Sequence, residues 1–158
     1  MAAINTELRR RQCLALALML LASTATWSAP REKARVVDVW KSPTCGCCKD
    51  WVAHLEENGF EVRTHDEGNT DARQRLGMPL RYGSCHTASI GGYAIEGHVP
   101  AREIRRLLKE RPAALGLAVP AMPVGSPGMD GPAYGQRKDP YEVLLVAKDG
   151  STTSYQHY

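Results

Sequence analysis

One short stretch of this sequence, which holds three cysteines within four residues, constrains the fold most strongly. The β-branched run at residues 36–40, just before it, predicts a strand. Apolar residues then recur at helical spacing over residues 51–55, and Asn58-Gly59 is a helix stop signal. The cysteines therefore lie on a turn that leads from a strand into the start of a helix; they are Cys45, Cys47 and Cys48.

This position has chemical consequences for the thiols. A helix start offers unpaired backbone N–H groups and the positive end of the helix dipole, and both favour a thiolate. The thiolate is the form of cysteine that attacks electrophiles and binds metals. Cys45 and Cys48 have C-x-x-C spacing with Cys47 between them, so we expect a redox dithiol, with Cys45 and Cys48 as catalytic residues and a third sulfur beside them. A structural disulfide with one spare cysteine is the alternative.

The first 29 residues have the pattern of a secretory signal peptide. Three arginines at 9–11 precede an apolar run at 13–21, and small residues follow at 22–25. The apolar run is too short for a comfortable membrane span. We therefore predict a signal peptide over 1–29 and one exported domain over 30–158, without stable membrane insertion after cleavage. An uncleaved N-terminal anchor is the alternative.

Charge and cysteine count narrow the function further. The chain has 20 Lys and Arg against 17 Asp and Glu; the predicted leader takes three and one of these, which leaves a net charge of +1. This balance gives no reason to expect nucleic acid or an anionic membrane as a partner. The exported domain keeps four cysteines, with Cys85 as the distant one. Disulfides are the default in an exported protein, and here they compete with metal binding because three of the four are adjacent.

The remaining pattern predicts an α/β protein with a mixed central sheet and flanking helices. We expect a helix at 47–58, a strand at 60–64 parallel to the first, a short helix at 70–76, a strand in the latter half of 80–90, a Gly91-Gly92 hairpin, a strand at 93–96 and a helix from Pro100 to Pro112. This order resembles the thioredoxin-like fold. That resemblance implies that Cys85, at the start of the third strand, faces the dithiol.

The segment 115–129 is rich in Gly, Pro and Met. We expect it to be irregular throughout, because proline interrupts both helices and sheets. Long loops in compact domains are often functional. A C-terminal hairpin with strands at 141–147 and 152–155 should follow it.

Four converging sulfurs suit Cu(I), Zn(II) or an iron–sulfur cluster. The thioethers of Met122 and Met129 favour copper, although either side chain could simply fill a gap. Zinc is less expected because the paired C-x-x-C spacing of structural zinc sites is absent. Successive strand residues face opposite sides, so Cys85 and His86 can both face the cluster only if the backbone bends. The roles of His86 and His98 stay open.

Four motifs together carry a resemblance to a known family: residues 40–48, 84–87, 97–100 and 122–129. They resemble a family of exported bacterial proteins whose members are called CopG when they are encoded with copper-resistance genes. The resemblance implies a thioredoxin-like periplasmic protein that interconverts Cu(I) and Cu(II). It also implies a set of copper ligands, namely Cys45, Cys47, Cys48 and Cys85.

The leading hypothesis is thus a periplasmic copper-binding protein for copper tolerance, which holds Cu(I) through the C-x-C-C cluster and the distant cysteine. Its partners would be copper ions and other periplasmic copper-handling proteins. The alternative is a thiol–disulfide oxidoreductase of the cell envelope, in which Cys45 attacks and Cys47 or Cys48 resolves the mixed disulfide. A third hypothesis is a structural domain with two disulfides and no metal. Whether the protein is an enzyme, a chaperone or a sink stays open.

Overall fold

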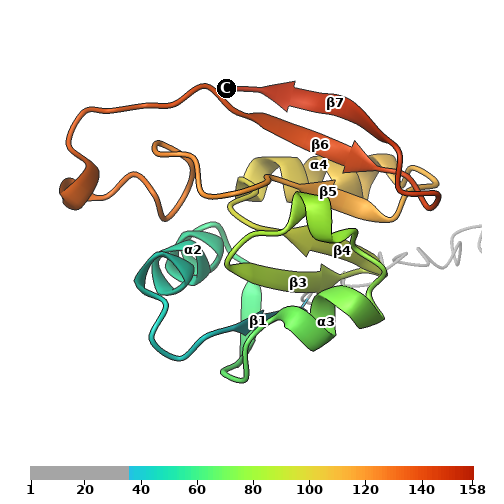
Figure 1. Ribbon diagram of the computed structural model, residues 1–158, viewed down its shortest axis with the longest axis horizontal. Coiled ribbons are helices and arrows are strands. Elements are labelled where there is room, and N and C mark those ends of the chain that lie inside the picture. The colour runs from blue at the N-terminus through green and yellow to red at the C-terminus, as the bar shows by residue number, and fades with distance from the viewer. Residues whose placement is uncertain (1–35) are drawn as a thin grey trace, which may run out of the picture. The chain divides into compact units, whose positions relative to one another are not determined.

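The computed structural model describes residues 36–158, so the predicted signal peptide at 1–29 lies outside the described residues. The described chain forms one seven-stranded sheet in the order β2-β1-β3-β4-β5-β6-β7 (Figure 1). Its elements are β1 (Val36–Lys41), α2 (Gly46–Glu57), β2 (Glu61–His65), α3 (Thr70–Arg75), the 3-10 turn η1 (Leu80–Tyr82), β3 (His86–Ile90), β4 (Tyr93–Glu96), α4 (Ala101–Glu110), β5 (Gly116–Ala118), η2 (Pro132–Tyr134), β6 (Glu142–Val146) and β7 (Thr152–His157). Within this part of the chain, no helix has the length and apolar character needed to cross a membrane.

The sheet is mixed, as the sequence predicts. Strands β1 and β2 are parallel and joined by α2, which confirms the expected βαβ unit. Strand β3 runs antiparallel to β1 and forms a hairpin with β4 across Gly91-Gly92. The predicted class, an α/β protein with a mixed central sheet and flanking helices, is confirmed.

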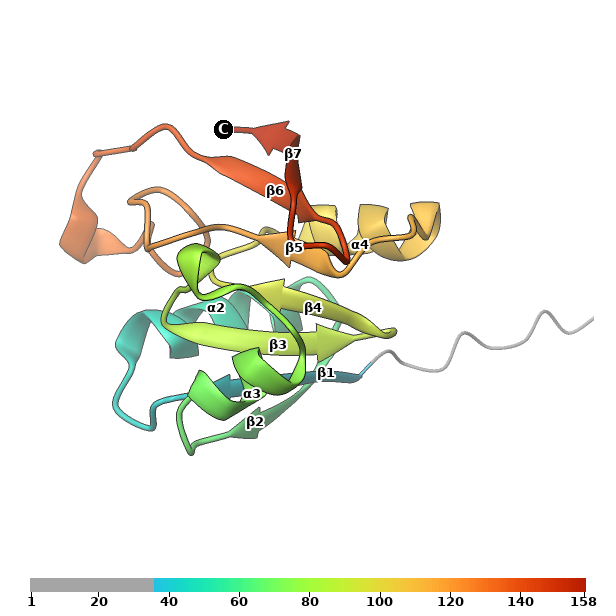
Figure 2. The same ribbon diagram turned by 45° about the vertical axis from the view of Figure 1, so that its right-hand side comes forward.

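Two helices and the sheet enclose the main core. Helices α2 and α4 lie on one face of the sheet, and α3 lies on the other (Figures 1 and 2). Trp51 of α2, Ile104 of α4 and the alternate residues Val37 and Val39 of β1 are fully buried together. Each such side chain contributes about 1.5–3 kcal/mol through its burial. The core therefore fixes the start of α2 against the sheet.

The expectation that residues 115–129 are irregular throughout is wrong at β5. This strand pairs parallel with β4 and antiparallel with β6, so it joins the C-terminal hairpin to the central sheet. It ends before Pro120, and its first residue is Gly116, where a Cβ would lie only 1.7 Å from the carbonyl oxygen of Ala94. A glycine thus allows the strand to fit where a larger residue would not. The remainder, 119–129, is irregular as predicted.

Candidate metal centre

The three clustered cysteines lie at the junction of β1 and α2, as the sequence predicts. Cys45 is the residue just before the helix and has extended backbone angles, φ −72° and ψ 105°. Cys47 and Cys48 belong to the first helical turn. Cys48 is fully buried, whereas Cys45 and Cys47 are partly exposed. The turn therefore presents two sulfurs outward and one toward the core.

Cys85 completes a compact group of four sulfurs. Cys45 and Cys48 form a disulfide, and among the described cysteines Cys47 and Cys85 are free. The Cys47 Sγ lies 3.6 Å from the Cys45 Sγ and 3.7 Å from the Cys85 Sγ. All four sulfurs lie within 4.8 Å of one another. The structure thus brings together every cysteine that the sequence singled out, and these four described cysteines form one disulfide rather than two.

Two histidines extend this group of donor atoms. The chain bends at Cys85, immediately before β3, so that Cys85 and His86 face the same region. The Cys85 Sγ lies 3.3 Å from His86 Nδ1 and 3.2 Å from His98 Nε2. The bend is the condition under which both neighbours could face the cluster. Cys85 therefore stands between a group of sulfurs and a pair of imidazoles.

The protonation of His98 follows from its partners. Its Nδ1 lies 2.8 Å from the carbonyl oxygen of Pro127, and because a carbonyl can only accept, Nδ1 carries the proton and donates. Nε2 then directs a lone pair toward the Cys85 Sγ. Such an anchored imidazole is typical of metal-ligating histidines. Burial lowers the pKa of His98, which favours the neutral ring.

His86 is more deeply enclosed. Its ring packs against Trp51, with 4.3 Å between ring centroids, and edge-on against His98. Its buried Nε2 has no hydrogen-bond partner among the described residues. Burial lowers the pKa of His86 well below its usual value, and the nearby His98 adds to this effect. Both histidine rings are therefore uncharged near neutral pH, and each has a nitrogen lone pair that could bind a metal.

Cys85 itself is held as a thiol. Burial raises its pKa to about 12, and the neighbouring Cys47 adds to the rise. Since only the thiolate binds a metal, an ion that binds here must displace the proton. Metal–sulfur bonds are about 2.3 Å long, so two sulfurs that share an ion must lie within about 4.6 Å of each other. The separations of 3.6 and 3.7 Å satisfy this limit.

The Gly/Pro/Met-rich segment covers one side of the cluster. Gly128 has φ +81°, and a Cβ there would lie 2.6 Å from the Cys47 carbonyl oxygen and 2.7 Å from the Trp51 nitrogen. The segment is thus packed directly on the first turns of α2. Met129 is almost buried, and its sulfur accepts a hydrogen bond from the Tyr134 hydroxyl at 3.3 Å. Met122 is 48% exposed.

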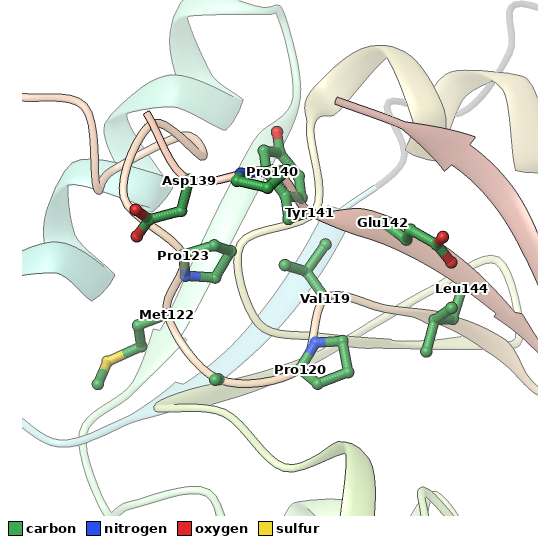
Figure 3. Close-up of a pocket in the computed structure, with 10 residues that line it drawn as sticks. Val119, Pro120, Met122, Pro123, Asp139, Pro140, Tyr141, Glu142 and Leu144 are labelled. Carbon is green, nitrogen blue, oxygen red and sulfur yellow. The ribbon is translucent and has the colours of Figure 1, made fainter. Parts of the chain in front are cut away.

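The same segment also forms a wall of a pocket of about 530 Å³. Pro120, Met122 and Pro123 line this pocket, and Asp139 and Pro140 lie beside Pro123 (Figure 3). The wall also contacts the turn before β3, because the Ser84 hydroxyl donates to the carbonyl of Ala121. Met122 therefore lines an open surface next to the residue that bonds the turn before Cys85.

Sequence reasoning missed one buried feature beside the cluster, the ion pair of Arg73 and Glu96. Glu96 is fully buried and Arg73 is 8% exposed. Arg73 lies in a short charged helix, and Glu96 ends an exposed-looking hairpin strand. Neither pattern differs from that of a surface residue, so no signal in the sequence could have identified the pair.

Comparisons with known proteins agree with this geometry. Residues 82–129 match the model of a family described as "Protein of unknown function, DUF411". No curated protein matches the chain. A solved structure titled "Copper resistance protein copG- Form 2" is 46% identical, covers 80% of this chain and 99% of its own, and superposes with a TM-score of 0.73. A second, "Form 1", is 48% identical, covers 78% and 96%, and has a TM-score of 0.71. At this identity and coverage, the chain belongs to the CopG family of copper resistance proteins.

Proposed function

We propose that this protein binds copper ions for copper tolerance and holds them as Cu(I) through Cys45, Cys47, Cys48 and Cys85. The observation that carries the proposal is the convergence of four sulfurs within 4.8 Å. Soft thiolates are the ligands that Cu(I) prefers, and neutral imidazoles suit the same metal. The titles of the two similar structures, both copper resistance proteins, support copper over other soft metals.

We place this function in the periplasm. The predicted signal peptide at 1–29 supports export. Sequencing the N-terminus of the protein recovered from the cell envelope tests this assignment. Cleavage near residue 29 supports it, and an intact N-terminus in the cytoplasmic fraction contradicts it. Copper-handling proteins of the same compartment are then the expected partners.

The disulfide couples the copper site to redox chemistry. With Cys45 and Cys48 joined, Cys47 and Cys85 are the free thiols of the cluster; reduction makes all four available. When the dithiol closes to the disulfide, it releases two electrons and two protons. Two Cu(II) ions can each take one electron and become Cu(I), while the protons pass to solvent. A further cycle needs a dithiol reductant of the envelope.

The first experiment is a titration of the fully reduced protein with Cu(I), in competition with a chromogenic chelator and without oxygen. A parallel titration uses Zn(II). Tight Cu(I) uptake that is lost on thiol alkylation, together with weak Zn(II) uptake, supports the proposal. Failure to compete for Cu(I) contradicts it.

The Cys85→Ser variant tests the distant sulfur. Because Cys85 is the member that joins the sulfurs to the imidazoles, its loss should lower Cu(I) affinity by about a hundredfold or more. The measurement is the same chelator competition, with circular dichroism to show that the variant folds. Unchanged affinity and stoichiometry would exclude a four-sulfur site.

A second function, thiol–disulfide exchange, is favoured by one observation. The Cys45–Cys48 disulfide has the C-x-x-C spacing of oxidoreductases, and a third thiol, Cys47, lies 3.6 Å from Cys45. That thiol would itself compete for mixed disulfides, which opposes efficient turnover. The test compares reduction of a model protein disulfide by the reduced protein with reduction by glutathione at equal thiol concentration. A rate no faster than that of glutathione excludes this function.

A further inference from the structure

A buried ion pair lies behind the turn that carries Cys85. Glu96, the last residue of β4, is fully buried, and its Oε1 accepts from Arg73 Nε at 3.0 Å and from Arg73 Nη2 at 2.8 Å. Its Oε2 accepts from the Thr87 hydroxyl at 2.6 Å. Both oxygens of the carboxylate therefore accept from donors: Arg73 of α3, Thr87 of β3 and the Ser84 N–H of the turn before β3.

Both polar backbone groups of Ser84 are bound by this network. The Ser84 N–H donates to Glu96 Oε1 at 2.7 Å. The Ser84 carbonyl accepts from Arg73 Nη2 at 2.6 Å and from Asn69 Nδ2 at 3.1 Å. This carbonyl belongs to the peptide that joins Ser84 to Cys85. The peptide plane before Cys85 is thus held by the side chains of Arg73 and Asn69, and the peptide before it by Glu96, rather than by the sheet.

Stability alone does not explain this arrangement. A buried ion pair seldom stabilises a protein more than well-packed apolar side chains of the same volume. Here, however, each charge also holds one backbone group of the residue next to Cys85. Hydrogen bonds with one charged partner are roughly twice as strong as neutral ones. They therefore suit a role in fixing the position of one side chain.

We propose that Arg73 and Glu96 are positioning residues for Cys85: they hold its peptide so that the Cys85 sulfur stays 3.7 Å from that of Cys47. Neither residue contacts the sulfurs, so they act through Ser84. The two residues set the distance between the Cys47 and Cys85 thiols whether or not copper is bound. The consequence, that loss of the pair weakens copper binding, rests on the proposed function.

The decisive variant is Arg73→Met/Glu96→Leu, which removes both charges together. Because apolar replacement of a whole buried pair is often neutral for stability, the variant should fold. The first readout is the effective concentration of Cys47 and Cys85 toward each other, measured with Cys45→Ser and Cys48→Ser in the background. At equilibrium with glutathione, each Cys47–Cys85 disulfide forms as one glutathione disulfide is reduced to two thiols. We expect this effective concentration to fall by about tenfold or more, because misplacement of one reacting group is costly.

Two further variants serve as a graded test and as a control. Asn69→Ala removes one donor to the Ser84 carbonyl and to the Thr87 hydroxyl and leaves the ion pair in place, so it should give a smaller fall in the same direction. Arg106→Met/Glu110→Gln is the matched control, since it removes an exposed ion pair on α4 and should change nothing. An unchanged effective concentration in a folded Arg73→Met/Glu96→Leu variant overturns the proposal. If that variant does not fold, Arg73→Gln/Glu96→Gln, which removes both charges but keeps a polar amide at each position, takes its place, and a wild-type value in that variant overturns the proposal.

The second readout is Cu(I) affinity of the same pair variant, with all four cysteines present. We expect it to fall, and we expect the pair variant combined with Cys85→Ser to bind Cu(I) as tightly as Cys85→Ser alone, because both changes act on the same sulfur of the cluster. If the losses in Cu(I) affinity of the pair variant and of Cys85→Ser add up in the combined variant, the proposal is overturned, since a merely structural role of the pair would weaken binding independently of Cys85. If the wild type takes up no Cu(I), the proposed function fails while the glutathione measurement still decides the positional claim.

Discussion

The two parts of the cysteine cluster are held in different ways. Cys45, Cys47 and Cys48 are placed by consecutive backbone at the start of α2, where one turn of helix brings their sulfurs together. Cys85 reaches the same point from a separate turn, whose backbone is bound by side chains of α3 and β4. We call Cys45, Cys47 and Cys48 the local part of the cluster, because neighbouring backbone places them, and Cys85 with its turn the tertiary part, because distant side chains hold it. The position of the fourth sulfur is therefore linked to distant polar residues, whereas the other three follow from the cysteine motif.

The most damaging single substitution should break the tertiary part. Glu96→Gln leaves the Arg73 guanidinium buried without a counter-charge, because Glu96 is the carboxylate that pairs with it. Removal of one partner from a buried pair costs about 3–5 kcal/mol of unfolding free energy. Urea denaturation measures this loss, and the Arg73→Met/Glu96→Leu variant should recover most of it.

The matched control for Glu96→Gln is Glu110→Gln. Glu110 pairs with Arg106 on the surface of α4, and both side chains are more than 40% exposed. Exposed pairs of this kind contribute little, so its urea midpoint should equal that of the wild type. Equal urea midpoints for the two Gln variants would show that the buried Arg73–Glu96 pair contributes no more to stability than the exposed Arg106–Glu110 pair.

A second substitution tests how tightly the segment 119–129 packs on the start of α2, where the three clustered cysteines lie. Gly128→Ala adds a Cβ against the backbone of Cys47 and Trp51, at a positive φ that other residues avoid. The strain and the overlap together should cost about 3 kcal/mol, measured by urea denaturation. The Gly92→Ala control has a similar φ of +85° but nothing within 4 Å of its Cβ. It should therefore cost only about 1 kcal/mol. Equal losses would mean that the segment does not press on α2.

The parts of the fold that the sequence predicted correctly are those set by local patterns. The β1–α2–β2 unit follows from β-branched and helical periodicity, and the β3–β4 hairpin from Gly91-Gly92. The meeting of Cys85 with the other cysteines rested instead on a resemblance to a known fold. The structure confirms the coarser prediction of a mixed sheet with flanking helices.

What the sequence could not reveal depends on contacts between distant residues. Strand β5 has three residues and exists because β4 and β6 pair with it on both sides. The bend at Cys85 reverses the strand alternation that would separate Cys85 from His86. The Arg73–Glu96 pair is hidden because charged residues usually face solvent. Each case is a tertiary effect that overrides a local preference.

The smallest expected effect concerns the imidazoles. It tests whether the tertiary part contributes His98 to the proposed copper site in addition to Cys85. His98→Gln removes a ring whose Nδ1 is anchored on Pro127 and whose Nε2 faces the Cys85 sulfur at 3.2 Å. Loss of such a neighbour should lower Cu(I) affinity by about tenfold, measured by chelator competition. His65→Gln is the control, because His65 is partly exposed on β2 and bonded to Asp38. If the two variants bind Cu(I) equally, His98 serves only to fasten the covering segment, and the copper site consists of the four sulfurs alone.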